Sequence, residues 1–176
     1  RRVNIVGNPA VVSVGMIEAG TRNNIIPEVA TMMGTIRTFD PELRKKIYRE
    51  ISQIAKGVET SSGTSIKVEF DVGGFYPVTF NNIALGERMK KSLIEASNGN
   101  FAEIPRRTGA EDFSYFSQEI PGLYIFLGVN DPDKMNQAGN HSPYFTVNDE
   151  ALDEGLRSLI YMLSLIHISE PTRLAE

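Results

Sequence analysis

One histidine in this sequence stands where it could do chemistry. His141 lies in the middle of residues 139–145 (Gly-Asn-His-Ser-Pro-Tyr-Phe), a segment whose residue types favour tight turns. A neutral imidazole is a good zinc ligand, and turns on both sides would hold the ring on a stiff loop. The alternative is a surface histidine that binds nothing, because a zinc site needs several convergent ligands.

A second polar motif lies upstream at residues 107–114 (Arg-Thr-Gly-Ala-Glu-Asp-Phe-Ser). Thr108 and Glu111 have the spacing of a helix capping box, which explains both residues without any function. Gly109 just inside a helix start would instead let backbone N–H groups approach an anion closely. Asp112 could orient a metal-binding histidine, or it could be a first-turn acid favoured by the helix dipole.

Between these two motifs lies the apolar segment 123–128 (Leu-Tyr-Ile-Phe-Leu-Gly). Its continuous apolar run predicts a strand buried on both faces, as in the parallel sheet of an α/β enzyme. Helices are expected from Asn81 or Asn82 to about Ala96, from Glu111, and from Asn148. In the last helix we expect one apolar face to point inward, made up of Leu152, Leu156, Leu159 and Ile160.

The first half of the chain has a different pattern. Segments 9–17 and 28–39 predict strands, and Asp40 followed by Pro41 predicts a helix start. The helix carries an apolar stripe of Leu43, Ile47, Ile51, Ile54 and Val58. Residues 66–72 alternate apolar and polar types, which predicts a strand buried on one side. We expect a small α+β layer over residues 1–78, most simply a ferredoxin-like βαββαβ unit that lacks its first strand and helix.

Composition excludes several classes of protein. The 176 residues carry a net charge of −4 and no basic run, which argues against a nucleic-acid partner. No apolar run reaches the length of a membrane span, so no membrane partner is expected. The absence of cysteine excludes disulfides and thiolate ligands.

Five motifs together resemble one family. They are Asn-Ile-Ile-Pro-Glu at 24–28, Gly-Thr-Ile-Arg-Thr-Phe at 34–39, Gly-Ala-Glu-Asp-Phe at 109–113, Ile-Pro-Gly-Leu-Tyr-Ile-Phe-Leu-Gly at 120–128 and His-Ser-Pro-Tyr-Phe at 141–145. They resemble the metal-dependent amidohydrolases of the aminoacylase and carboxypeptidase class, in the branch of hippurate hydrolases, N-acetyl-diaminopimelate deacetylases and auxin-conjugate hydrolases. The resemblance implies a lid or dimerisation domain at residues 1–78 and the C-terminal part of an α/β metallopeptidase catalytic domain at 79–163.

The resemblance also implies roles for single residues. Asn24 and Arg37 would bind the polar groups of the substrate, although a turn-capping asparagine and a solvated arginine explain them equally well. Gly109 would lie beside the substrate carboxylate, His141 would be a metal ligand, and Asp112 would orient a ligand histidine. Two divalent metals, as zinc, manganese or cobalt, would activate a water in the parent protein.

No residue of this sequence is assigned as a catalytic base, because the resemblance places that glutamate and the other ligands in an N-terminal half that the sequence lacks. We therefore expect a fragment that is inactive and metal-free alone, from a parent that hydrolyses N-acyl amino acids or small peptide-like substrates. A homodimer through the lid and a cytoplasmic location are further expectations. The alternative is a non-catalytic dimerisation or ligand-binding module.

The end of the sequence has a different origin in our interpretation. Residues 163–173 resemble the translation of a transposon-based sequencing adapter, so 164–176 are expected to be non-native. A native amphipathic helix is the alternative. His167 is therefore not taken as a metal ligand.

Overall fold

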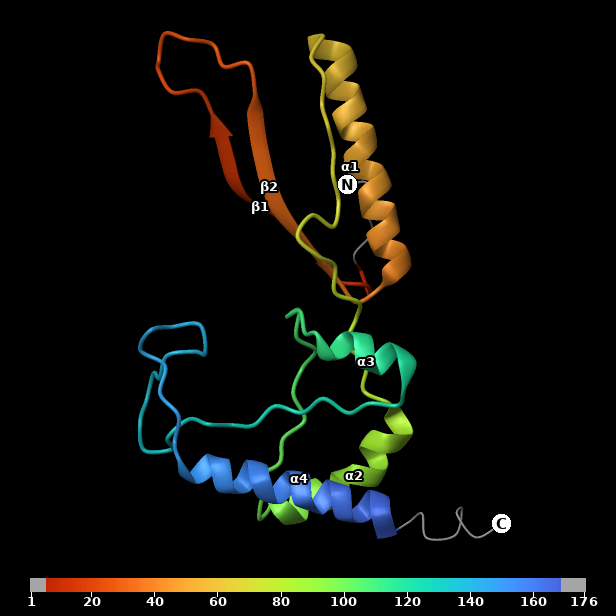
Figure 1. Ribbon diagram of the computed structural model, residues 1–176, viewed down its shortest axis with the longest axis vertical. Coiled ribbons are helices and arrows are strands. Elements are labelled where there is room, and N and C mark those ends of the chain that lie inside the picture. The colour runs from red at the N-terminus through yellow and green to blue at the C-terminus, as the bar shows by residue number, and fades with distance from the viewer. Residues whose placement is uncertain (1–5, 169–176) are drawn as a thin grey trace, which may run out of the picture. The chain divides into compact units, whose positions relative to one another are not determined.

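The computed structural model describes residues 6–168, with side chains as far as Leu165. The chain divides into two compact units. The first unit comprises Arg1–Thr79 and Arg106–Tyr115, and the second comprises Phe80–Pro105 and Phe116–Glu176. The backbone therefore passes between the units after Thr79, after Pro105 and after Tyr115. The described elements are β1 (Ala10–Ala19), β2 (Ala30–Thr38), α1 (Pro41–Ser62), α2 (Ile83–Ala96), α3 (Phe113–Glu119) and α4 (Glu150–Ile168) (Figure 1).

Strands β1 and β2 form an antiparallel hairpin, which confirms both predicted strands. The register runs from Ala10 opposite Thr38 to Ala19 opposite Ala30, with a bulge between Val14 and Met16. The two strands approach so closely there that a Cβ on Gly34 would lie 2.2 Å from the carbonyl oxygen of Ser13. Only glycine fits at this position, which explains the first residue of the motif at 34–39.

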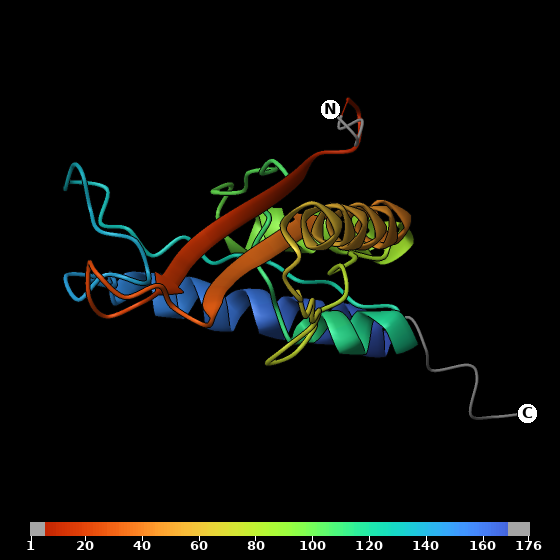
Figure 2. The same cartoon turned by 90° about the horizontal axis from the view of Figure 1, so that it is seen from above.

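Helix α1 begins where the sequence predicts. The Asp40 side chain accepts hydrogen bonds from the backbone N–H groups of Glu42 at 2.8 Å and Leu43 at 3.3 Å. Gly63 ends the helix with φ +70°. Within the first unit α1 packs beside β2, and β1 lies beyond β2 (Figures 1 and 2). The predicted stripe is fully buried only at Leu43 and Ile47, while Ile54 and Val58 stay about half exposed.

Residues 66–70 are extended but belong to no sheet of the described part, so the predicted strand is wrong in its pairing. The alternation itself is real, because Ile66, Val68 and Phe70 are half-buried and the residues between them are exposed. The segment is fixed to α1 instead. Its first backbone N–H donates to the Glu59 carboxylate at 2.7 Å. Alternation encodes which face is covered, whereas the partner of a strand edge is set by the rest of the fold.

The second unit is built on the packing of α2 against α4. The Asn82 side chain caps α2 by accepting from the Leu85 N–H at 2.9 Å. The buried side of α2 consists of Met89, Leu93 and Ala96, and Ala151 and Ser158 are buried on α4. No helix within residues 6–168 is long and apolar enough to cross a membrane.

The predicted strand at 123–128 is absent from the described structure. The side chain of Asn81 replaces a strand partner there, because it accepts from the Tyr124 N–H at 2.7 Å and donates to the Tyr124 carbonyl at 2.9 Å. Burial on both faces is also wrong, since Phe126 is 59% exposed. The amide group of an asparagine side chain can make the same two hydrogen bonds as one residue of a neighbouring strand. The apolar residues at 123–128 give no sign that a side chain takes this place.

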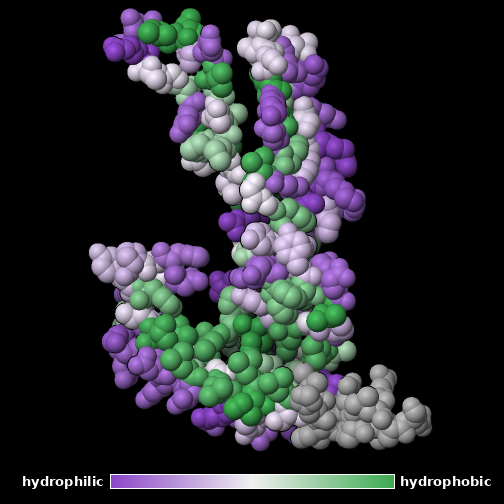
Figure 3. Space-filling view, viewed as in Figure 1, coloured by the Kyte–Doolittle hydropathy of each residue, from purple (hydrophilic) through white to green (hydrophobic). Residues whose placement is uncertain are grey.

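The expectation that the apolar face of α4 points inward is wrong as well. Leu152, Leu156, Leu159 and Ile160 are each more than half exposed. Amphipathic spacing predicted the helix correctly, but α2 covers a different side of it. The space-filling view shows apolar surface gathered over this unit (Figure 3).

Candidate functional site

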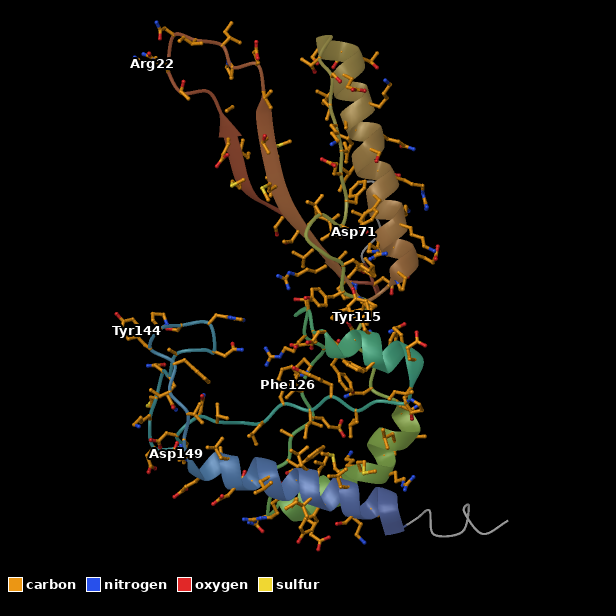
Figure 4. The ribbon with its side chains drawn as sticks, viewed as in Figure 1. Arg22, Asp71, Tyr115, Phe126, Tyr144 and Asp149 are labelled. Atoms are coloured by element: carbon orange, nitrogen blue, oxygen red, sulfur yellow. The ribbon has the colours of Figure 1, made fainter. Side chains whose placement is uncertain are left out.

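His141 lies on a loop that is closed at its base. The Asn148 N–H donates to the Val129 carbonyl at 2.9 Å where the loop leaves and rejoins the unit. Within the loop, the Ser142 N–H donates to the Gly139 carbonyl at 2.9 Å and the Phe145 N–H donates to the Ser142 carbonyl at 3.1 Å. His141 is thus held between two consecutive turns, as its neighbours in sequence predict. Its side chain is exposed, and the same loop carries the labelled Tyr144 (Figure 4).

The described residues do not complete a metal site. Within residues 6–168 no group of three or more histidine, aspartate or glutamate residues is arranged to hold a metal ion. An exposed imidazole on a tight turn fits the chemistry of one ligand, but a zinc site needs three or four. His141 alone therefore supplies one donor.

Arg37 lies near the end of β2, opposite Val11. Its Nη1 donates a hydrogen bond of 2.7 Å to the carbonyl oxygen of Thr108, across 71 positions of the sequence. Both residues belong to the first unit. The bond places the guanidinium beside Thr108 and its neighbour Gly109, so two of the predicted substrate-binding residues lie together.

Asn24 lies elsewhere in the first unit. It is exposed in the connection between β1 and β2, next to the turn in which the Ile25 N–H donates to the Arg22 carbonyl at 3.4 Å. Arg22 marks this tip of the hairpin (Figure 4). With about 3.3 Å per strand residue, the length of β2 from Ala30 to Arg37 separates the tip from Arg37 by roughly 20 Å. The hairpin therefore does not bring Asn24 and Arg37 together.

The segment around Gly109 is not a helix start. Helix α3 begins at Phe113, so Thr108 is not its N-cap and the predicted capping box does not form. The idea that Gly109 stands just inside a helix is wrong for the same reason. A Cβ on Gly109 would lie 3.9 Å from a carboxylate oxygen of Glu111. Asp112 is exposed, and its backbone carbonyl accepts from the Tyr115 N–H at 3.0 Å.

Three aromatic contacts that the sequence analysis missed also hold residues 106–115 in the first unit. The Arg106 guanidinium lies 5.9 Å from the Phe39 ring, and the Tyr115 hydroxyl donates to the Phe75 carbonyl. The Tyr76 and Tyr115 rings are 6.0 Å apart. No local sequence pattern predicts these contacts, because each one joins residues that are far apart in the sequence.

A surface pocket of about 410 Å³ lies in the second unit. None of the predicted site residues lines it. The lining comes from residues 80–83 and 117–122.

Comparison with known proteins gives a family. The model of peptidase family M20/M25/M40 matches residues 4–165. Thermostable carboxypeptidase 2 of Saccharolobus solfataricus is 37% identical over 147 residues, which is 84% of this chain and 37% of that protein. An N-acetyldiaminopimelate deacetylase of Streptococcus thermophilus is 36% identical over 143 residues, or 81% of this chain and 36% of that protein.

Two solved structures are similar in fold. A Bacillus subtilis protein described as a dinuclear metal-binding peptidase of the M20 family has a TM-score of 0.73 and 26% identity, over 92% of this chain and 42% of that one. A Staphylococcus aureus aminohydrolase structure has a TM-score of 0.73 at 23% identity, over 91% of this chain and 40% of that one. The chain thus spans well under half the length of these proteins. The resemblance seen in the five motifs is confirmed, and the chain belongs to peptidase family M20/M25/M40.

Proposed function

We propose that this chain is part of a metal-dependent amidohydrolase that cleaves the amide bond of an N-acyl amino acid or a small peptide. The family match supports this reaction class. The relatives named carboxypeptidase and N-acetyldiaminopimelate deacetylase support an amide bond next to an amino acid as the target. Residues 1–78 would be the lid, as an incomplete ferredoxin-like unit, and residues 79–163 would be part of the catalytic domain.

The observation that carries the proposal is the hydrogen bond from Arg37 to Thr108. A guanidinium has five N–H donors in a planar fork, and this bond of 2.7 Å uses one of them. The remaining donors suit a substrate carboxylate, and the missing side chain of Gly109 leaves space beside them. Arg37 and Gly109 would therefore bind the carboxylate of the acyl amino acid, whereas Asn24 of the same chain lies too far from Arg37 to bind that group.

His141 would hold one divalent metal ion in the complete protein, as zinc, manganese or cobalt, with the remaining ligands supplied by residues outside this chain. Bound metal supplies a water of lowered pKa as the nucleophile. Asp112 would help to orient a ligand histidine. Because the described residues do not complete the site, the chain alone should be inactive. A homodimer through the lid is also part of the proposal, whereas residues 164–176 would take no part.

The proposal is tested in the complete parent protein with single substitutions. Arg37→Ala should raise KM for an N-acyl amino acid by about tenfold or more, because it removes a charge-assisted hydrogen bond to the carboxylate. His141→Ala should lower both the bound zinc and kcat. Arg22→Ala at the hairpin tip is the matched control and should leave KM, kcat and the bound zinc unchanged.

Two outcomes contradict the proposal. Unchanged metal content and activity in both variants would favour a non-catalytic binding module. Hydrolysis by the 176-residue chain alone, at a rate that follows added zinc or manganese, would show instead that the chain holds a complete site.

A further inference from the structure

We propose that Gln137 is a positioning residue, which holds the loop of His141 in shape through three hydrogen bonds to its backbone. This inference rests on the proposed role of His141 as a metal ligand. It concerns the second unit alone, since Gln137, His141 and every partner named below belong to that unit.

The side chain of Gln137 makes three hydrogen bonds to the backbone at the start of the loop. Its Oε1 accepts from the Asp131 N–H at 2.9 Å. Its Nε2 donates to the Asp131 carbonyl at 2.7 Å and to the Lys134 carbonyl at 2.9 Å. Both amide protons and one oxygen lone pair are therefore used. Gln137 is half-buried, so these bonds are partly shielded from water.

The segment that Gln137 closes is also stabilised from within. The Lys134 N–H donates to the Asp131 carbonyl at 3.1 Å, and the Lys134 ammonium lies 2.8 Å from the Asp131 carboxylate. The Asp133 N–H donates to the same carboxylate at 3.0 Å. The hydrogen bond from Lys134, followed by that from the Asp133 N–H, lowers the pKa of Asp131. The carboxylate thus stays charged and keeps its partners at neutral pH.

These contacts shorten the part of the loop that is free to move. The bond between Asn148 and Val129 closes the base, and the chain between them is long for a loop without helix or strand. Gln137 ties residues 131–137 into one closed turn, and the turn from Gly139 to Ser142 follows almost directly. Little unconstrained backbone then remains before His141. Without Gln137, the backbone between Val129 and His141 would be free to move. Fixing the His141 ring in one position would then cost the conformational entropy of that whole stretch.

The test uses the 176-residue chain and three variants. Gln137→Ala removes all three bonds, whereas Gln137→Glu keeps an acceptor for the Asp131 N–H but loses both donors. Met135→Ala is the matched control, because Met135 lies in the same loop and is 89% exposed. The chain has two histidines, so the ring signal of His141 can be assigned by NMR with the help of a His167→Gln variant.

Gln137→Ala should speed hydrogen exchange of the Asp131 amide by about tenfold, the effect of losing one net hydrogen bond. It should also lower the NMR order parameter of the His141 ring. Gln137→Glu should have a smaller effect on the Asp131 amide, and Met135→Ala should change neither signal. If the Asp131 amide of Gln137→Ala exchanges faster but the order parameter of the His141 ring is unchanged, Gln137 does not position the histidine. That result would overturn the proposal.

A zinc titration of the complete parent separates this proposal from the proposed function. Gln137→Ala should weaken zinc binding by about tenfold, a typical loss when the support of a ligand is removed. If His141→Ala leaves zinc binding unchanged, the metal function fails even though the NMR result for Gln137 stands. If His141→Ala abolishes binding and Gln137→Ala leaves it unchanged, the positioning role fails alone.

Discussion

At the scale of single residues, Tyr48 on α1 fixes the extended segment that follows the helix. Its ring stacks on Phe70 with 4.0 Å between centroids, and its hydroxyl donates to the Asp71 carboxylate at 2.5 Å. Asp71 has φ +58°, a conformation that is unusual for a residue with a side chain. The hydrogen bond from Tyr48 is thus one of the contacts that hold this backbone turn. Figure 4 labels Asp71 in the turn.

Tyr48 should give the stability of the chain a pH dependence at alkaline pH. Burial, followed by the hydrogen bond to Asp71, raises the pKa of Tyr48 above its usual 10.0. The folded state then keeps a proton that the unfolded state has lost. The stabilisation is complete below pH 10.0 and is lost as the pH rises through the folded pKa.

The free energy of unfolding in urea, measured from about pH 9 to pH 11 for the protein and for a Tyr48→Phe variant, tests this pH dependence. This range covers about one unit on either side of the usual tyrosine pKa. The variant should lose less stability over that range. Tyr144→Phe, at a site that is 83% exposed, should behave like the unchanged protein. Equal slopes for the Tyr48 variant and the unchanged protein would show that this hydroxyl keeps an ordinary pKa.

Residue types predicted some local features and not others. The turns around His141 follow from Gly139, Ser142 and their neighbours, because each depends on adjacent residues alone. The bond from Arg37 to Thr108 joins residues 71 positions apart and depends on the whole first unit. The hydrogen bonds of Gln137 reach only Asp131 and Lys134, but a glutamine between Asn136 and Ala138 matches no known turn pattern, so the sequence did not predict them.

At the scale of elements, the hairpin depends on a close approach between its strands. Gly34→Ala would force a methyl group against the backbone of Ser13, where no flexible side chain can move aside. We expect a loss of about 1–3 kcal/mol in hairpin stability from overpacking. Hydrogen exchange of the β1 and β2 amides measures this directly.

Gly15→Ala is the control for that substitution. A Cβ on Gly15 would meet nothing within 4 Å, although Gly15 lies in the bulge of the same hairpin. Its exchange rates should stay close to those of the unchanged protein. Equal effects of the two alanines would mean that the lost flexibility of glycine, and not the contact with Ser13, determines the stability.

The ends of helices could be predicted better than the pairing of strands. Asp40 and Asn82 cap α1 and α2 through side chains that reach the next few residues, so the signal is local. Residues 66–70 and 123–128 carry strand patterns, but their hydrogen bonds go to Glu59 and Asn81. Neither the alternation at 66–70 nor the apolar run at 123–128 contains information on these partners, so the predicted strand pairing was wrong in both segments.

At the scale of the whole molecule, each of the two units is built from more than one stretch of the chain. The backbone passes between them three times, and the segment Arg106–Tyr115 belongs to the first unit although its neighbours on both sides belong to the second. Arg37, Arg106 and Tyr115 provide the contacts that hold it there. The motif Gly-Ala-Glu-Asp-Phe is therefore anchored to the unit that carries the β1–β2 hairpin.

The second unit leaves one apolar face of α4 open to water. Leu152, Leu156 and Leu159 are 57%, 59% and 55% exposed and lie on one side of the helix. Complete burial of a leucine is worth about 1.5–3 kcal/mol, so each of these side chains forgoes roughly half of that amount. Such a face should bind apolar dyes and promote self-association of the chain.

A triple substitution of these leucines by glutamine tests the consequence. The variant should bind clearly less of the dye ANS and should sediment as a smaller species at high concentration, while circular dichroism keeps its helical signal because glutamine favours helices about as well as leucine. Asp153→Ser on the same helix is the control and should leave dye binding unchanged. If the triple variant binds as much dye as the unchanged chain, the leucines are covered in solution and α4 has a partner that residues 6–165 do not show.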